Sequence, residues 1–489
     1  MGKNKNQSLY KKQREALIEE KLLEKKKKRT KIALIAVLSV VVAAAVAVGA
    51  WLYFDKVLFS EEATFERDLI KNTHKENPEK SPLEKSGLKN GDFTYALYED
   101  GTATLSYYWG DAKELKVPEK IDGHTVMTIG QSCFYNKTDL KRIEFPDSVK
   151  YFEEYAFQNA GITEVTIPEE NTAIKEGTFV YCTALKKITL PAGVEKIESG
   201  AFFGCTSLEK VSLSEKLKSI GSYAFSECTA LKELALPEGL ERAEENAFSK
   251  CKALEKINLP EKMKSVGPYM LSECSSLKEI AVPSKIKELP EALFYNCTGL
   301  EKVTLPENLE KIGLSAFYNC TSLKNLDIPE TVTEIGDYAF CYCYLLDGVT
   351  PPENLKKLGA YVFVDCKALT SMYIPEKIAE IPEYCYAGCT SLTDITIPDT
   401  VKKIGDYAFA ECDSVKRVVV PEGVEHIGIC SFWKMDSILT IDLPMSLLSI
   451  GEGAFADGNE LTIRCYQEDS FAWEYATERR INVEISKKD

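Results

Sequence analysis

Cysteine is the residue whose number and spacing first suggest chemistry. The 489-residue chain has 16 cysteines, and eleven of them recur at intervals of 23 residues. The recurring cysteines are Cys182, Cys205, Cys228, Cys251, Cys274, Cys297, Cys320, Cys343, Cys366, Cys389 and Cys412. Stacked copies about 5 Å apart could be oxidised to disulfides, but an odd number cannot pair completely. Because cysteine is small, apolar and usually buried, we expect these thiols to form a reduced column in the core.

The other cysteines give little sign of a metal site. Cys341 and Cys343 form a Cys-x-Cys pair, and Cys385 and Cys389 lie four residues apart. Each pair includes a member of the recurring column, and no second pair follows at the spacing of a zinc ribbon. We therefore predict no bound metal. Cys341 and Cys430 fall outside the recurring positions and are expected to be exposed thiols at the surface.

Catalytic residues are also scarce. His426 lies four residues before Cys430, but its position holds Lys or Ser in other repeats, so we interpret it as a solvated surface histidine. The sequence has no Gly-x-Ser-x-Gly, His-Glu-x-x-His, P-loop or dinucleotide-binding motif, and its acidic residues are spread over many outward positions. No catalytic residue, cofactor or metal ligand is predicted, and an enzyme is disfavoured.

A repeat of 23 residues must position the recurring cysteines. Proline follows a short apolar run at 168, 191, 237, 260, 283, 306, 329, 352, 375, 398, 421 and 444. Phenylalanine keeps the same period at 179, 202, 225, 248, 294, 317, 340, 363, 409, 432 and 455, with Leu271 and Tyr386 as replacements. Phe134 and Phe157 extend this series toward the N-terminus. Such a period indicates a repeat architecture.

The spacing of apolar residues changes within one unit. Ile188 and Leu190 alternate with polar residues, which predicts a short strand that Pro191 ends. The Ile-Gly step that follows permits a tight turn, and the Ala-Phe-x-x-Cys segment is typical of a short helical or 3₁₀ piece. One unit buries too little apolar surface to offset its ordering entropy, so units must stack. The predicted fold class is a repeat solenoid with parallel strands, each coil having one β-strand and one short helical or 3₁₀ turn.

Both ends of the repeat region are expected to cap it. Residues 91–126 alternate apolar and polar positions on both sides of an Asp-Gly turn, which predicts an N-terminal β-hairpin cap. The solenoid of about 15 repeats then occupies 127–460. Residues 461–489 form the predicted C-terminal cap, with a strand at 461–466, a helix at 470–480 that Ser470 begins, and a last strand at 481–485.

A membrane segment is predicted ahead of the repeats. Residues 1–31 carry 12 Lys or Arg against 4 Glu and form a basic cytoplasmic leader. Residues 32–54 are uncharged and, as a single transmembrane helix, would cross a hydrocarbon core of about 30 Å. The basic leader places the N-terminus on the cytoplasmic side of the plasma membrane and the repeats on the extracellular side. The alternative is a cleaved signal that releases a secreted protein. A charged linker occupies 55–90.

The charge of the repeat region excludes one class of partner. The whole chain carries a formal net charge of −15, and the leader contributes +8, which leaves −23 on the remainder. A body this acidic repels phosphate backbones, so we predict no nucleic-acid partner.

The stretch Leu185-Lys-Lys-Ile-Thr-Leu-Pro-Ala-Gly-Val-Glu-Lys-Ile-Glu-Ser-Gly-Ala-Phe-Phe-Gly-Cys-Thr-Ser-Leu208 resembles the BspA-like leucine-rich repeat. The resemblance extends over about 91–458, and the segments at 121–126 and 470–476 resemble elements that accompany this family. It implies a bacterial or protozoal cell-surface protein, with adhesion or binding of host and matrix proteins. The predicted N-terminal membrane helix and the lack of an LPxTG-like tail depart from members that are attached at the C-terminus.

A ligand site is predicted on the outward residues of the strands. Four residues before each proline, charge is absent from Asn325 to Ser371, and two residues before, the one aromatic residue is Tyr373. Uncharged surface around exposed aromatic residues is typical of binding sites, although drift among repeats would also explain it. The predicted site comprises Tyr344, Gly348, Thr350, Ser371, Tyr373 and Val419.

These observations predict a membrane-anchored cell-surface leucine-rich-repeat protein that binds extracellular protein or glycan ligands without catalysis. A structural or scaffolding protein of the cell envelope is the first alternative. An exported enzyme with an unrecognised site is the second.

Overall fold

The computed structural model describes residues 83–455 and 461–486, which belong to one compact unit, Glu79–Asp489. Within these residues no helix is long and apolar enough to cross a bilayer. The predicted leader at 1–31, the predicted transmembrane helix at 32–54 and most of the predicted linker lie outside the described residues. Their assignments stay predictions.

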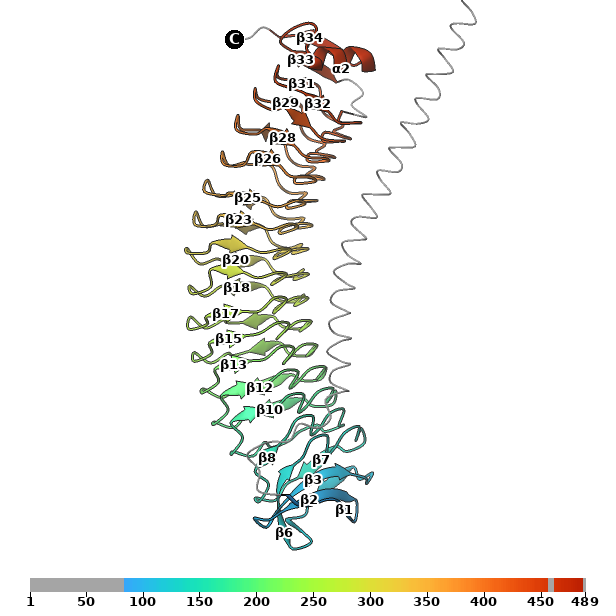
Figure 1. Ribbon diagram of the computed structural model, residues 1–489, viewed down its shortest axis with the longest axis vertical. Coiled ribbons are helices and arrows are strands. Elements are labelled where there is room, and N and C mark those ends of the chain that lie inside the picture. The colour runs from blue at the N-terminus through green and yellow to red at the C-terminus, as the bar shows by residue number, and fades with distance from the viewer. Residues whose placement is uncertain (1–82, 456–460, 487–489) are drawn as a thin grey trace, which may run out of the picture. The chain divides into compact units, whose positions relative to one another are not determined.

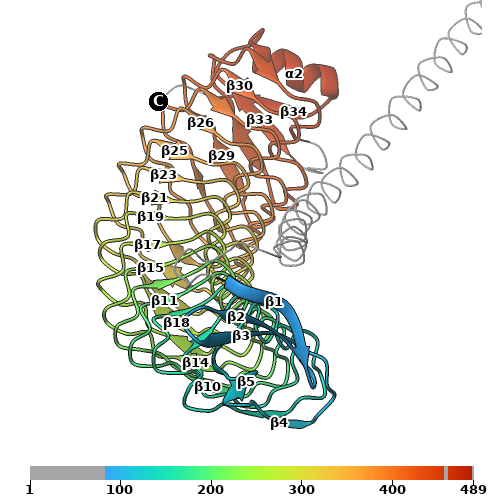
Figure 2. The same cartoon turned by 60° about the horizontal axis from the view of Figure 1, so that its bottom comes forward.

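The described part begins with a mixed sheet. Its strand order is β1 (Leu83–Asn90), β2 (Phe93–Tyr98), β3 (Thr102–Tyr108), β6 (His124–Ile129) and β5 (Lys120–Ile121). The antiparallel β2–β3 pair is the expected hairpin, and left-handed Gly101 closes its turn by donating to Tyr98 O at 3.0 Å. The sheet lies across one end of the stacked coils (Figure 2).

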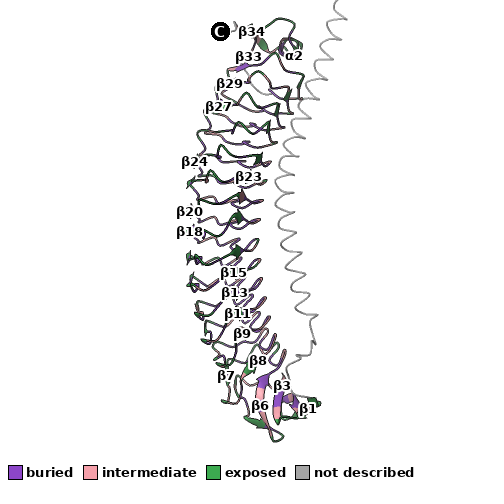
Figure 3. Cartoon of the chain, turned by 60° about the vertical axis from the view of Figure 1, so that its left-hand side comes forward, coloured by how far each residue is buried: buried purple, intermediate pink, exposed green. Residues whose placement is uncertain are grey.

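Strand β1 occupies residues that the sequence assigned to the linker. It pairs with β2 through its backbone, but its side chains are almost all exposed (Figure 3). An edge strand of this kind has no alternation of apolar and polar residues, so hydropathy does not reveal it.

The repeats stack as successive coils (Figure 1), and most coils contribute a strand to each of two parallel ladders. In the first ladder the strands precede the repeat prolines. They are β7 (Arg142–Glu144), β10 (Lys187–Thr189), β12 (Lys210–Ser212), β14 (Glu233–Leu234), β16 (Lys256–Ile257), β18 (Glu279–Ala281), β20 (Lys302–Thr304), β22 (Asn325–Leu326), β24 (Gly348–Val349), β27 (Ile395–Thr396), β29 (Arg417–Val419) and β31 (Thr440–Asp442). A short strand β4 (Glu114–Lys116) pairs with β7.

The second ladder was not predicted, because strands of two residues are too short to show a period. Its strands are β8 (Tyr151–Phe152), β9 (Ala173–Ile174), β11 (Lys196–Ile197), β13 (Ser219–Ile220), β15 (Arg242–Ala243), β17 (Ser265–Val266), β19 (Glu288–Leu289), β21 (Lys311–Ile312), β23 (Glu334–Ile335), β25 (Lys357–Leu358), β26 (Glu380–Ile381), β28 (Lys403–Ile404), β30 (His426–Ile427) and β32 (Ser449–Ile450). Paired residues differ by 23 positions, as in Ile188 with Val211 and Ile197 with Ile220. Equivalent side chains of successive coils are therefore stacked.

The Ala-Phe-x-x-Cys segment is a run of turns, which corrects the predicted helical or 3₁₀ piece. Residues two positions before and two after the phenylalanine are left-handed, as in Tyr223 (φ 57°) and Glu227 (φ 61°) around Phe225. Tyr223, Phe225 and Glu227 donate their N–H groups to carbonyls of the next coil. Ser226 between them donates its N–H to Tyr223 O in the same coil. Because the N–H groups point alternately to the next coil and to the same coil, no run of hydrogen bonds within the segment can form a helix. We call this side of the stack the turn edge.

The glycine of the Ile-Gly step serves close packing, which corrects the role predicted for it. Gly336 is not left-handed, but a Cβ there would lie 2.7 Å from Leu314 N and 2.8 Å from the carbonyl carbon of Gly313. Both atoms are backbone atoms of the preceding coil. Glycine is thus required by the distance between coils rather than by its conformational freedom.

The core contains a column of aromatic rings beside the column of thiols. Neighbouring rings stack nearly parallel, as in Phe179 and Phe202, with centroids 5.4 Å apart. Tyr386 continues the column, whereas Leu271 interrupts it. Tyr108 of β3 packs on the first ring, Phe134, at 5.8 Å.

The C-terminal cap has the predicted elements. They are β33 (Thr462–Cys465), α2 (Phe471–Arg479) and β34 (Asn482–Ile485). Ser470 begins the helix as N-cap, and its side chain accepts a hydrogen bond from Trp473 N. Tyr475 of α2 packs edge-on against Phe455, the last ring of the column, at 5.8 Å. The aromatic column is therefore closed by a tyrosine at each end.

Candidate functional site

The first ladder presents its side chains as predicted. In β10 the middle residue Ile188 is buried, while Lys187 and Thr189 are exposed. All six residues of the predicted site are exposed. The exposed fractions of the larger ones are 38% for Tyr344, 37% for Tyr373 and 44% for Val419.

The centre of the predicted site lies on two successive coils. Gly348 and Thr350 belong to the coil of β24, and Ser371 and Tyr373 to the next one. Gly348 is in register with Asn325 of β22, whose amide group occupies the space that a side chain at Gly348 would need. The uncharged surface thus continues onto Asn325.

The coil that carries Ser371 and Tyr373 has lost its strand. Between β10 and β31 every other coil contributes a strand to the first ladder. Pro351 contributes to this loss, because the equivalent Leu190 donates its N–H to Ser212 O in the next coil at 2.9 Å. Proline has no N–H, so the carbonyl of Tyr373 lacks this donor.

Two side chains supply hydrogen bonds where the ladder is missing, Tyr386 within the coil of Tyr373 and Asp347 between this coil and the preceding one. The hydroxyl of Tyr386, which stands at a phenylalanine position, donates to Tyr373 O at 3.4 Å. The carboxylate of Asp347 accepts from the Thr370 hydroxyl at 2.8 Å and from the Thr370 amide at 3.2 Å. The sequence shows Tyr386 as a replacement at a phenylalanine position but not this role, because Tyr373 O comes within reach only when the coil is folded.

Tyr373 lies beside carboxylates. Partial burial and the nearby Glu353, Glu376 and Glu330 raise the pKa of Tyr373. Its phenol is therefore neutral at physiological pH, and it presents both a ring face and a hydrogen-bonding hydroxyl to a ligand.

Tyr344 and Val419 lie apart from this centre. The ring of Tyr344 is covered by the Lys367 ammonium at 5.0 Å and tilts against Tyr342, toward the turn edge. Val419 is in register with Thr396, so a whole coil separates it from Tyr373. The structure brings together Gly348, Thr350, Ser371 and Tyr373, and leaves the other two as flanking positions.

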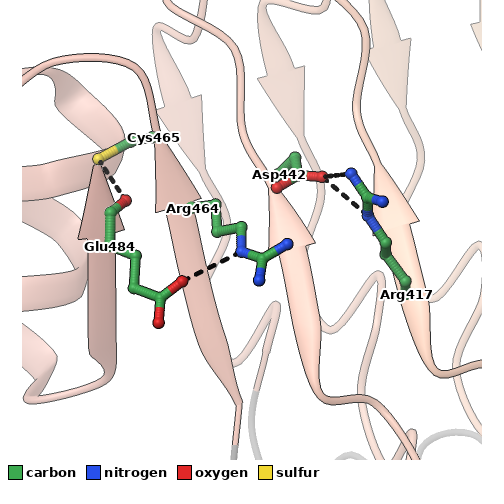
Figure 4. Close-up of polar contacts among 5 residues, drawn as sticks. All are labelled: Arg417, Asp442, Arg464, Cys465 and Glu484. Atoms are coloured by element: carbon green, nitrogen blue, oxygen red, sulfur yellow. Dashed lines mark hydrogen bonds and ion pairs between the residues drawn. The ribbon is translucent and has the colours of Figure 1, made fainter. Parts of the chain in front are cut away.

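Arginine and carboxylate pairs occupy the first ladder beyond Val419. Arg417 donates through Nε and a terminal nitrogen to the nearly buried Asp442, at 3.0 and 2.6 Å (Figure 4). Two strands further on, Arg464 bonds to Glu484 at 3.2 Å (Figure 4). Paired charges therefore limit the uncharged surface on this side.

The predicted thiol column is confirmed, with all sixteen cysteines free and buried. Each recurring cysteine donates its S–H to the carbonyl of the aromatic position in the preceding coil, as in Cys205 with Phe179 O at 3.1 Å. Burial raises the pKa of Cys251 and of Cys297 to about 12. These thiols are thus protonated donors rather than nucleophiles.

The off-column cysteines are also buried, which corrects their predicted exposure. Cys341 is 3% exposed and Cys430 is 5% exposed. Cys430 belongs to a second, small hydrophobic cluster on the turn edge, in which it packs with Ala410 and Trp433. His426 is exposed as predicted, and its Nδ1 lies 2.8 Å from the Ser449 hydroxyl. Among the described residues, no group of three His, Cys, Asp or Glu side chains could hold a metal ion.

Coils with in-register strands, one aromatic and one cysteine position each, and capped ends define a leucine-rich-repeat solenoid. The chain belongs to the BspA-type leucine-rich-repeat family. It matches the BspA type leucine rich repeat region (6 copies) over residues 106–232, 195–324, 274–393 and 379–469. The family resemblance of the sequence is thereby confirmed.

The first of two similar solved structures shows the same fold. A leucine-rich repeat protein from Bacteroides ovatus is 28% identical, with 82% of this chain and 98% of that chain covered and a TM-score of 0.65. A leucine rich cell surface protein from Faecalibacterium prausnitzii is 25% identical, with 81% and 98% covered and a TM-score of 0.48. No curated protein matches the chain.

Proposed function

We propose that this protein is a single-pass plasma-membrane protein, with its N-terminus in the cytoplasm, that displays its solenoid outside the cell to bind protein or glycan ligands without catalysis. The observation that carries the binding proposal is the uncharged surface formed by Gly348, Thr350, Ser371 and Tyr373. On most neighbouring coils the column of Gly348 and Ser371 holds a charged residue, such as Lys302 or Asp394. These four side chains carry no charge of their own that a ligand would have to desolvate, and the exposed tyrosine offers a rigid anchor.

The surface proposal is supported by the basic leader and uncharged segment of the sequence. The non-catalytic proposal is supported by the state of the candidate nucleophiles, since the thiols of the column are buried with raised pKa values and His426 is a surface residue.

Binding is tested by replacing Tyr373 with alanine in the full chain. Cells that display the wild-type protein are screened against glycan arrays and extracellular-matrix proteins, and the ligand with the strongest signal is titrated. We expect Tyr373→Ala to weaken binding at least 10-fold, the loss typical of a central aromatic residue. Tyr151→Ala is the matched control, because Tyr151 is an exposed tyrosine (44%) on β8 near the other end of the array. Equal affinity of the wild type and Tyr373→Ala would reject this site.

Topology is tested by protease treatment of intact cells that express the chain with a C-terminal tag. We expect the tag to remain with cells and to disappear on treatment. Digestion only after lysis would reject surface display, and a tag found in the medium would favour the secreted alternative.

A further inference from the structure

The second ladder is interrupted at two prolines. It runs continuously from β9 to β17, from β19 to β25 and from β26 to β32. The residue after the strand is Pro290 in the coil that follows the first break and Pro382 in the coil that follows the second.

In other coils this residue closes the ladder with its N–H. Gly405, for example, donates to Ile381 O in the preceding coil at 2.8 Å. Pro290 and Pro382 have no N–H, so the carbonyls of Val266 and Leu358 cannot receive this bond. The two interruptions therefore follow from the missing N–H of proline.

At Pro382 the first ladder is interrupted between the same two coils. Pro351 removes the donor to Tyr373 O, and the side chain that joins the coils here is Asp347, which accepts from the Thr370 hydroxyl of the next coil. These coils thus lack ladder bonds between their backbones on both strand-bearing sides. At Pro290 the first ladder is also interrupted, because β16 and β18 do not pair, but its residue there is Leu259, which retains its N–H. The coils at Pro382 differ in that prolines remove a backbone donor from both ladders.

The turn edge remains joined across the Pro382 break. Phe363 donates to Cys385 O and Asp365 donates to Ala387 O, both at 2.8 Å. In the core, the rings of Phe363 and Tyr386 stay stacked at 5.1 Å. The turn edge is therefore fastened by a series of backbone bonds, whereas neither strand ladder joins these two coils.

We propose that the coils of Pro351 and Pro382 form a hinge, at which the solenoid bends about the turn edge. A side-chain hydrogen bond such as Thr370 to Asp347 breaks and re-forms more readily than a continuous backbone ladder. Gly348 and Thr350 lie on one side of the hinge, and Ser371 and Tyr373 lie on the other. Bending changes the distance between these two pairs, so the candidate site consists of two halves that move relative to each other. The hinge itself requires no ligand.

The hinge is tested by electron–electron distance measurement between spin labels on the full chain. The pair Glu334→Cys and Lys403→Cys spans Pro382 on the second ladder. The matched control pair, Glu288→Cys and Lys357→Cys, has the same separation of 69 residues but lies within one continuous run. All four positions are strand residues that precede a buried one, and the native thiols are buried.

We expect the distance distribution across Pro382 to be at least twice as wide as that of the control pair. Pro351→Ile with Pro382→Gly restores the residue types of the other coils, and it should narrow the distribution to the control width. If the double variant does not fold, Pro382→Gly alone should narrow it in part, because one ladder is restored. Equal widths for the two pairs in the wild-type background would overturn the hinge and leave the binding proposal intact.

Discussion

At the scale of single residues, the thiol column stabilises the array because its S–H groups donate hydrogen bonds between coils. Every recurring cysteine donates to a carbonyl of the preceding coil, as in Cys297 with Leu271 O at 3.1 Å. A carbonyl buried in the core without a donor would destabilise the fold by about 1–3 kcal/mol. Cysteine suits this position because it combines a small apolar volume with a weak donor.

Thiol reactivity follows from this arrangement. We expect Ellman's reagent to modify almost none of the sixteen cysteines of the native protein at pH 8, and all of them after unfolding in guanidinium, because burial keeps them protonated and inaccessible. Rapid modification of several thiols without denaturant would contradict a buried column.

Alkaline pH should destabilise the fold. Burial raises the pKa of Cys182 and Cys343 to about 12, against 9.0 for an unperturbed thiol. Between these values the unfolded state releases protons that the folded state retains, so the free energy of unfolding falls as pH rises. Each such thiol contributes a slope of up to about 1.4 kcal/mol per pH unit.

The measurement is denaturant unfolding followed by circular dichroism between pH 7.5 and 11. We expect full stability below about pH 9 and a steep loss above it. A variant with Cys343→Ala should show a shallower loss than the wild type. A stability that stays constant up to pH 11 would show that the thiols ionise equally in both states.

At the scale of elements, the distance between coils decides which residues fit. The glycine of the Ile-Gly step lies against the backbone of the preceding coil, as Gly336 does against Leu314 N. Tyr223 and Glu227 adopt left-handed conformations because the hydrogen bonds of the turn edge hold them there. Each element thus depends on its neighbour in the stack.

Replacing Gly336 with alanine should therefore be destabilising by about 1–3 kcal/mol, because the added methyl group meets backbone atoms that cannot move alone. The control is Gly193→Ala, since a Cβ there would meet its nearest atom, Glu169 O, at an ordinary 3.7 Å. Guanidinium unfolding of both variants checks the difference. Equal stabilities would mean that the coils move apart at little cost.

At the scale of the whole molecule, the array is a one-dimensional stack whose ends need protection. Tyr108 covers the first ring of the aromatic column and Tyr475 covers the last. In such a stack each coil contacts only its neighbours, so loss of a cap should first loosen the coils next to it.

Tyr475→Ala should expose Phe455 and destabilise the C-terminal coils by about 3–5 kcal/mol. Hydrogen exchange measured by mass spectrometry should accelerate in 439–455 and 461–465 and stay unchanged in 187–212. Phe471→Ala is the control, because that side chain lies on the same helix but is 39% exposed. Faster exchange along the whole array would show that the stack unfolds as one unit instead.

The sequence by itself determined the family, the stacked register, the buried thiol column and the C-terminal cap. These features rest on local pattern, because a 23-residue period places identical residues next to one another in any stack. For the same reason the outward position of Tyr373 was predictable.

Only the tertiary structure decided the second ladder, the left-handed turn edge and the burial of Cys341 and Cys430. It also linked Pro351 to Tyr386, which are 35 residues apart in the chain. The physical reason is that hydrogen bonds between coils join groups 22 to 26 residues apart, as in Tyr223 with Glu245 and Cys205 with Phe179. Whether a carbonyl has a donor there depends on the facing coil and not on its own neighbours in sequence.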